Sequence, residues 1–165
     1  MSQGDLVGRM IGAASLSVDT FEEVEADETA TGQAAVVVAM VAVAAAIGTS
    51  GQGFGAALLS PLAALLGWVV WAGVTFFIGT KLFGGTATWG ELLRTLGFAS
   101  APGILLLVAA LPLVGFFVNL LVPLWMLVAG IIAIRQALDF TTGKAILTAV
   151  VGWLALFIPR LILGG

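Results

Sequence analysis

Forty consecutive residues without a charge, 95–134, constrain this chain more than any other feature of its sequence. A single α-helix of that length would be about 60 Å long, at 1.5 Å per residue. The hydrocarbon core of a bilayer is only about 30 Å thick. The run therefore has to fold back, and the segment LPLVG at 111–115 supplies the proline and glycine that break helices. We expect two transmembrane helices here, joined by a tight turn.

The composition points to lipid rather than water as the solvent of this chain. Only 9% of the 165 residues are charged and 61% are hydrophobic, whereas a soluble domain carries about 25% charged residues. A transmembrane helix needs about 20 apolar residues, and the sequence offers five such segments. The predicted fold is therefore an all-α integral membrane protein, a bundle of five transmembrane helices at 33–47, 57–78, 93–111, 116–134 and 145–163.

The polar residues are concentrated before the first span, so we divide the chain into a cytoplasmic segment, 1–30, and a membrane domain, 31–165. Residues 5–18 carry a modest amphipathic stripe, which fits either a helix on the inner leaflet or a poorly ordered tail. Residues 19–28 include six acidic side chains, and Thr20 and Glu23 have the spacing of a capping box. This stretch is either a capped helix leading to the membrane or an acidic docking surface for a basic partner.

The basic residues set the predicted orientation. With five spans, five of the six fall on the N-terminal side of the membrane, namely Arg9, Lys81, Arg94, Arg135 and Lys144, and only Arg160 falls on the other. Lys and Arg near span ends are enriched on the cytoplasmic side. We therefore expect the N terminus in the cytoplasm and the C terminus outside.

The chain lacks the side chains that most catalytic and metal sites use. It contains no histidine and no cysteine, and no carboxylate pair or Ser–Lys dyad falls within a predicted span. An ionisable residue inside a span is by default a functional candidate, but none is predicted near the bilayer centre. We expect no enzyme activity, no cofactor, no metal site and no nucleic-acid partner. Four tryptophans fall in the middle of spans, where we expect packing and lipid contact: Trp68, Trp71, Trp125 and Trp153.

The entry to the third span carries the most specific local pattern. Thr88 and Glu91 have the spacing of a capping box, which fixes a helix start. Glu91 and Arg94 are three residues apart, so we expect them to pair on one helix face. Gly97 and Ser100 are small enough for close helix packing, and Pro102 predicts a kink because it frees a backbone carbonyl. The kink either shapes a cytoplasm-facing groove or is purely structural.

These residues resemble the Yip-domain (Ypt/Rab-interacting protein) family of membrane proteins. Residues 89–102, WGELLRTLGFASAP, are similar to the family's G-Y-x-x-x-P element at the third span, with Phe98 in place of tyrosine. The stretch TFEE at 20–23 resembles the lead of prokaryotic members. The D-L-Y-G-P element of eukaryotic members has no good match, which puts a direct Rab-type GTPase partner in doubt.

The resemblance implies a non-enzymatic membrane protein that binds partner proteins and organises membrane or trafficking complexes. The implied partner-binding or kink residues are Glu91, Arg94, Gly97, Phe98, Ser100 and Pro102, and the implied cytoplasmic docking residues are Thr20, Phe21, Glu22 and Glu23. Besides the lipid bilayer, the expected partner is another membrane protein or a second copy of the chain. The alternatives are a small transporter or channel, possibly oligomeric, and an accessory subunit of a larger complex. A prokaryotic plasma membrane is the expected location, with an internal eukaryotic membrane as the alternative.

Overall fold

The computed structural model describes residues 5–48 and 54–162, and the side chains within 5–48 and 59–155. All the regular structure in these residues is helical. The α-helices are α1 Leu6–Ala14, α2 Val18–Ala26, α3 Ala30–Gly48, α4 Phe54–Phe77, α5 Trp89–Ala99, α6 Val114–Ala137 and α7 Thr142–Ile162. A π-helix, η1 Ile78–Leu82, continues α4, and a 3-10 helix, η2 Ala101–Val108, follows α5.

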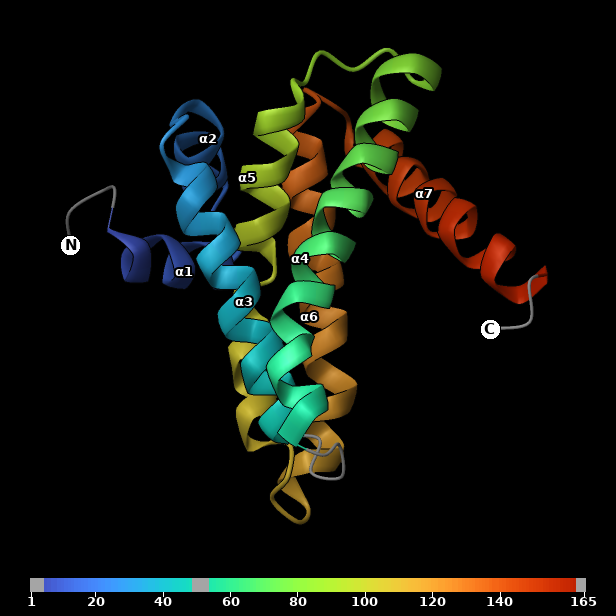
Figure 1. The fold of residues 1–165 in the computed structure, drawn as a ribbon. Coiled ribbons are helices and arrows are strands. Elements are labelled where there is room, and N and C mark those ends of the chain that lie inside the picture. The colour runs from blue at the N-terminus through green and yellow to red at the C-terminus, as the bar shows by residue number, and fades with distance from the viewer. Residues whose placement is uncertain (1–4, 49–53, 163–165) are drawn as a thin grey trace.

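Four rods form the bundle: α3, α4 with η1, α5 with η2, and α6 (Figure 1). Each contains a stretch long and apolar enough to cross a membrane, namely Ala30–Gly48, Leu59–Leu82, Trp89–Val108 and Val114–Ala137. Helix α7 leaves the bundle at an angle, and its shorter apolar stretch is Thr142–Ala155. Large apolar side chains point outward along the rods, as on α6, where Phe116 is 70% exposed and Leu124 is 53% exposed. This surface matches the hydrocarbon interior of a bilayer.

The 40-residue uncharged run folds back as expected. The turn between η2 and α6 lies at residues 109–113, and Leu113 has a φ of 66° there. Gly115 follows closely, and a Cβ at this position would lie 2.1 Å from the carbonyl oxygen of Ala109. Proline and glycine in this segment therefore permit the close return of the chain, and the predicted hairpin is confirmed.

The third span differs from the single kinked helix that we expected. Helix α5 stops at Ala99, and the chain continues through Ser100 into eight residues of 3-10 helix with Pro102 near its start. Pro102 has no N–H to continue the α-helical ladder, and the chain tightens into i→i+3 pairing instead. A 3-10 run of this length is unusual.

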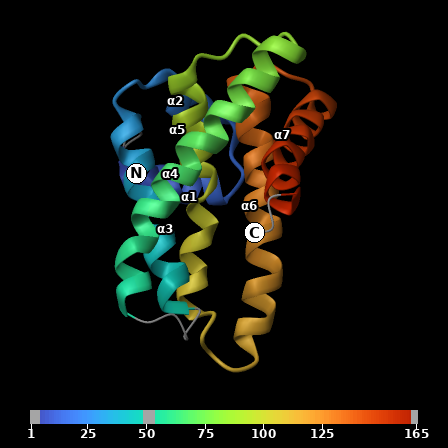
Figure 2. The ribbon, with the colours of Figure 1, turned by 45° about the vertical axis from the view of Figure 1, so that its right-hand side comes forward.

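Two short helices, α1 and α2, pack together against the bundle and form what we call the N-terminal unit (residues 6–26). Residues 6–14 form helix α1, as the first of the two alternatives predicts, and the helix ends before Leu16, whose φ is 61°. The N-terminal unit lies along one half of the bundle (Figure 2), where α1 contacts α5 and η2, and α2 contacts α5 and α6. The predicted capping box of Thr20 and Glu23 is wrong, because α2 begins at Val18 and Ser17 is its N-cap.

Candidate functional site

The start of α5 is fixed by the capping box that the sequence predicted. The Thr88 Oγ1 accepts a hydrogen bond from the Glu91 N–H at 3.3 Å, and the Glu91 Oε2 accepts one from the Thr88 N–H at 2.8 Å. Two N–H groups at the helix start are thereby satisfied. The box sets where the helix begins and hence which way the residues one turn later point, including Arg94.

Arg94 binds the N-terminal unit rather than Glu91. Its side chain is only 6% exposed, its Nε donates to the carbonyl oxygen of Val24 at 3.1 Å, and one terminal nitrogen donates to that of Glu25. No ion pair joins Arg94 to Glu91, both of which the structure describes, so the predicted pair is wrong. The last carbonyls of a helix lack partners within it, and a buried guanidinium needs acceptors. Arg94 meets both needs by capping the C-terminal end of α2.

The remaining residues of the family-like element are packed inside the bundle. Phe98 is fully buried, Pro102 is less than 2% exposed, and the Ser100 hydroxyl donates to the Gly97 carbonyl oxygen at 2.6 Å. A Cβ on Gly97 would lie 2.7 Å from the Cβ of Ala34, so this glycine lets α5 approach α3 closely. Ser100 lines a cavity of about 300 Å³ together with Trp68 and seven other residues.

The four predicted docking residues of α2 do not form one exposed surface. Phe21 is fully buried, and Thr20 packs on Gly12, where a Cβ would lie 2.2 Å from its hydroxyl oxygen. Glu23 accepts hydrogen bonds from the guanidinium of Arg9. Glu22 is exposed, and its carboxylate accepts a hydrogen bond from the Gln136 amide at 3.0 Å. Of the four, only Glu22 presents its charge on the surface.

Glu22 belongs to a cleft that we call the acidic cleft, between α2, the start of α5 and the end of α6. It encloses about 300 Å³ and is lined by Glu22, Glu25, Ala26, Glu91, Gln136 and Asp139. Burial, followed by the neighbouring carboxylates Glu91 and Asp139, raises the pKa of Glu25 to about 7. Within the part of the chain that the structure describes, no three acidic side chains are grouped to hold a metal ion. The cleft is thus a concentration of negative charge open to solvent.

Sequence reasoning included Glu25 only within the general acidic stretch 19–28, and it missed Asp139 as a member of this site. One signal was present: the predicted five-span topology places 19–28, Glu91 and Asp139 on the same side of the membrane. That topology could not say which of these side chains face one another, because this depends on how α2 docks against α5 and α6.

A second polar cluster lies between the N-terminal unit and the start of α3. Arg9 is 4% exposed and donates to Glu23 at 3.0 Å, to Asp27 at 2.5 Å and to Gln33 at 2.9 Å. Hydrogen bonds from Thr29 and Arg9 lower the pKa of Asp27 to about 2. We call these residues the Arg9 cluster. Both anionic groups of the cluster are less than one-third exposed, and they neutralise the one basic side chain of α1.

Two of the mid-span tryptophans donate hydrogen bonds in addition to packing against their neighbours. The Trp68 Nε1 donates to the Leu93 carbonyl oxygen at 3.0 Å, which ties α4 to α5. The Trp125 Nε1 donates to the carbonyl oxygen of Ala14, the last residue of α1, at 2.7 Å. The second bond gives α1 a C-terminal cap supplied by α6, just as Arg94 caps α2.

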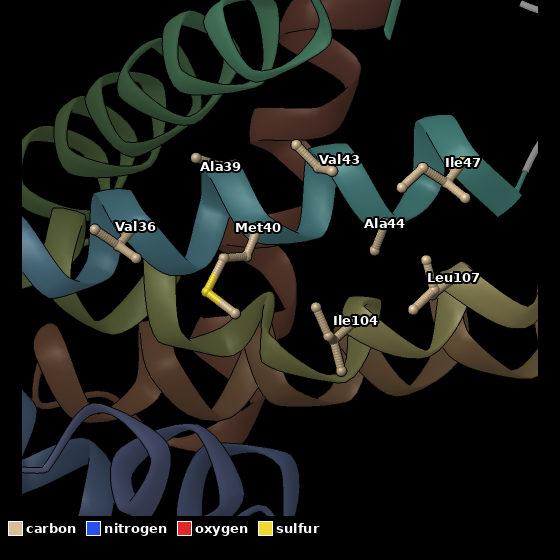
Figure 3. Close-up of a pocket in the computed structure, with 8 residues that line it drawn as sticks. All are labelled: Val36, Ala39, Met40, Val43, Ala44, Ile47, Ile104 and Leu107. Carbon is tan, nitrogen blue, oxygen red and sulfur yellow. The ribbon is translucent and has the colours of Figure 1, made fainter. Parts of the chain in front are cut away.

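The η2 helix also forms a groove with α3, of about 500 Å³ (Figure 3). The residues that line it are all apolar, so none could bind an ion or perform chemistry. They are Val36, Ala39, Met40, Val43, Ala44, Ile47, Ile104 and Leu107. Such a surface is suited to lipid tails. The acidic cleft and the Arg9 cluster both lie at the end of the bundle that carries α2.

Comparison with known proteins gives one match. A family model, described as the Yip1 domain, covers residues 16–163, which include α2 to α7 and leave out α1. No curated protein and no solved structure matches the chain.

Proposed function

The chain belongs to the Yip1 domain family, and from that premise we propose that it is a non-enzymatic membrane protein that binds partner proteins and organises membrane or trafficking complexes. Apolar helices long enough to cross a bilayer agree with membership of a membrane protein family. From Arg94 to Pro102 the family element of the third span is mostly buried, so this part supports the fold, and partner contact has to involve other residues.

The acidic cleft is the observation that carries the partner-binding proposal. Four carboxylates line it, and α2 is held there by the buried side chains of Phe21 and Arg94. Negative charge beside a membrane repels anionic lipid headgroups. A basic segment of a protein partner is the ligand that this charge favours, with its Lys or Arg side chains paired to Glu22, Glu25, Glu91 and Asp139.

Purification in mild detergent tests this proposal. The protein, the variant Glu22→Gln/Glu25→Gln and the matched control Asp19→Asn/Glu28→Gln are recovered from the same cells. The control removes the same number of carboxyl groups from residues outside the cleft. We expect a stoichiometric partner with the protein and with the control, and loss of most of it with the cleft variant. Recovery of the protein alone in repeated preparations, or equal recovery with both variants, would contradict the proposal.

The proposed topology has five spans, a cytoplasmic N terminus and an outside C terminus, in a prokaryotic plasma membrane. The 21 residues of α7 would be about 31 Å long, enough to cross the hydrocarbon core when upright. The distribution of basic residues supports the orientation. Reporter fusions at Gly84 and Phe140 should read cytoplasmic, and a fusion at Pro112 should read external. The reverse pattern would refute the proposed orientation.

Transport by a small carrier or channel is the second candidate, and the interruption of α5 by η2 favours it. Broken helices line the path in many transporters. However, the cavity beside Ser100 is lined mostly by apolar groups, which does not stabilise an ion. An accessory-subunit role is a form of the partner-binding proposal, and co-migration on native gels would reveal it. Ion flux in reconstituted liposomes would support the transporter instead.

A further inference from the structure

The depth of α1 within the bundle can be measured along α6. The Trp125 side chain contacts the carbonyl of Ala14 at the end of α1, and the Gln136 side chain contacts Glu22 of α2. These two α6 residues are 11 positions apart, or about 16 Å along the helix axis at 1.5 Å per residue. The end of α1 therefore lies much closer to the middle of the bundle than the exposed carboxylate of Glu22 does.

This level lies within the membrane-crossing part of α6. The apolar stretch of α6 is followed by Arg135 and Gln136, the first polar side chains at that end, which mark the boundary with the headgroups. A contact ten residues before Arg135, even allowing for the reach of the indole, places α1 on the lipid side of that boundary. This holds whichever side of the membrane is cytoplasmic. Figure 1 shows α1 lying across the side of the bundle rather than beyond its end.

The surface of α1 is suited to that depth. Its one basic side chain, Arg9, is turned inward and paired within the Arg9 cluster, so no cation is left in an apolar medium. On the outward face, Val7 is 55% exposed and Ile11 is 52% exposed. They are four residues apart and so share one helix face. Helix α1 also contacts η2, which carries outward apolar side chains of its own, among them Leu105 and Leu107.

We propose that α1 is an in-plane membrane helix whose Val7–Ile11 face contacts the acyl chains of one leaflet, the one on the side of α2. Amphipathic helices of this kind lie about 5–10 Å into the headgroup–acyl boundary. Most of them use exposed basic residues to attract anionic lipid. In α1 the only arginine is paired with Glu23 and Asp27 and cannot attract lipid headgroups. Contact with acyl chains alone therefore holds the Val7–Ile11 face in the membrane, and its insertion does not depend on headgroup charge. The helix lies outside the family match.

Spin labels on single cysteines test this placement, since the chain contains no native cysteine. Nitroxides are attached to Val7→Cys and Ile11→Cys, to Leu121→Cys as the lipid reference and to Glu28→Cys as the water reference. Leu121 and Glu28 are both exposed, on α6 and after α2 respectively. The full-length proteins are reconstituted in vesicles of neutral phosphatidylcholine, with and without anionic phosphatidylglycerol. Collision of each label with oxygen, which partitions into lipid, is compared with collision with a water-soluble nickel chelate.

We expect the oxygen-to-nickel ratio at Val7 and Ile11 to match the Leu121 reference, severalfold above the Glu28 reference, and to be the same in both vesicles. Ratios like that of Glu28 would place the face in water and overturn the proposal. Exclusion of both reagents would show that a protein surface covers the face, and would also overturn it. A high ratio only with phosphatidylglycerol would show recognition of anionic headgroups instead. Thermal midpoints equal to that of the unlabelled protein establish that each variant is folded.

Discussion

Replacing Gly97 by alanine tests whether the family element acts by close packing of α5 on α3. The new Cβ would lie 2.7 Å from the Cβ of Ala34 and 3.2 Å from its Cα and carbonyl oxygen, against an ordinary contact of 3.4–4 Å. Because two of these three atoms are backbone, α3 itself has to move. Overpacking of this kind costs about 1–3 kcal/mol, and alanine returns up to about 1 kcal/mol through its helix propensity. The expected net loss is about 1–2 kcal/mol.

Gly130 of α6 provides the matched control, since a Cβ there has nothing within 4 Å. Gly130→Ala should be neutral or stabilising by up to about 1 kcal/mol. For a protein of this size 1 kcal/mol shifts the thermal midpoint by roughly 2–4 °C. Thermal unfolding in one detergent, followed by tryptophan fluorescence, should place the midpoint of Gly97→Ala about 2–12 °C below that of Gly130→Ala. Equal midpoints, or a more stable Gly97→Ala, would refute the steric reasoning.

Three further predictions concern the end of the bundle that carries α2. Arg94→Ala should weaken the docking of the N-terminal unit on the bundle by roughly 3 kcal/mol, because two charge-assisted hydrogen bonds are lost. Limited proteolysis should then cut residues 6–26 faster. Arg94→Lys should restore protection from the protease only in part. The pKa of Glu25 is raised from 4.5 to about 7, so the docking free energy is fully present below pH 4.5 and falls as the pH rises through 7. After discounting for solvent screening, the loss is about 1 kcal/mol; protease resistance should decrease from pH about 5 to about 8, and Glu25→Gln should remove this dependence. Thr88→Ala should lower the unfolding free energy by about 1 kcal/mol, and Thr88→Ser should recover most of it, because only serine retains the capping hydroxyl; an unchanged thermal midpoint in Thr88→Ala would contradict the role of the cap.

The features that the sequence predicted well are those with a local cause. The hairpin follows from the length of the uncharged run and from the breakers at 111–115. The start of α5 follows from Thr88 and Glu91, which lie within one turn of each other. In both cases the interacting groups are close in the chain, and no knowledge of the tertiary fold is needed.

The features that could not be predicted from the sequence depend on partners far along the chain. The acceptors of Arg94 are backbone carbonyls 69 and 70 residues away. Every residue has a backbone carbonyl, so the residue types in the sequence do not indicate which ones accept this bond. Glu91 was the nearest acidic side chain, so local spacing pointed to the wrong partner. Likewise, Thr20 and Glu23 have a capping spacing, but Ser17 takes that position and Glu23 turns to Arg9.

Pro102 was predicted to kink the third span, and the structure shows a larger effect. The loss of one N–H accounts for the end of α5 at Ala99. It does not account for the continuation of the 3-10 helix to Val108, six residues later. Gly48 is in close contact there, since a Cβ on it would lie 1.7 Å from the Leu106 carbonyl oxygen. The 3-10 helix thus lies in close backbone contact with the end of α3.

The caps of α1 and α2 come from residues far along the chain, and this sets the order in which the protein can fold during synthesis. Arg94 and Trp125 supply those caps, and Trp125 lies 111 residues after its acceptor, Ala14. At about 5–20 residues per second, the ribosome reaches Trp125 roughly 5–20 s after it has made α1. During that interval the Arg9 cluster can form, because its members lie within 24 residues of Arg9. The end of α2 stays uncapped until Arg94 has been made, and the end of α1 until Trp125 has been made. The first helices to be synthesised are thus completed by some of the later ones.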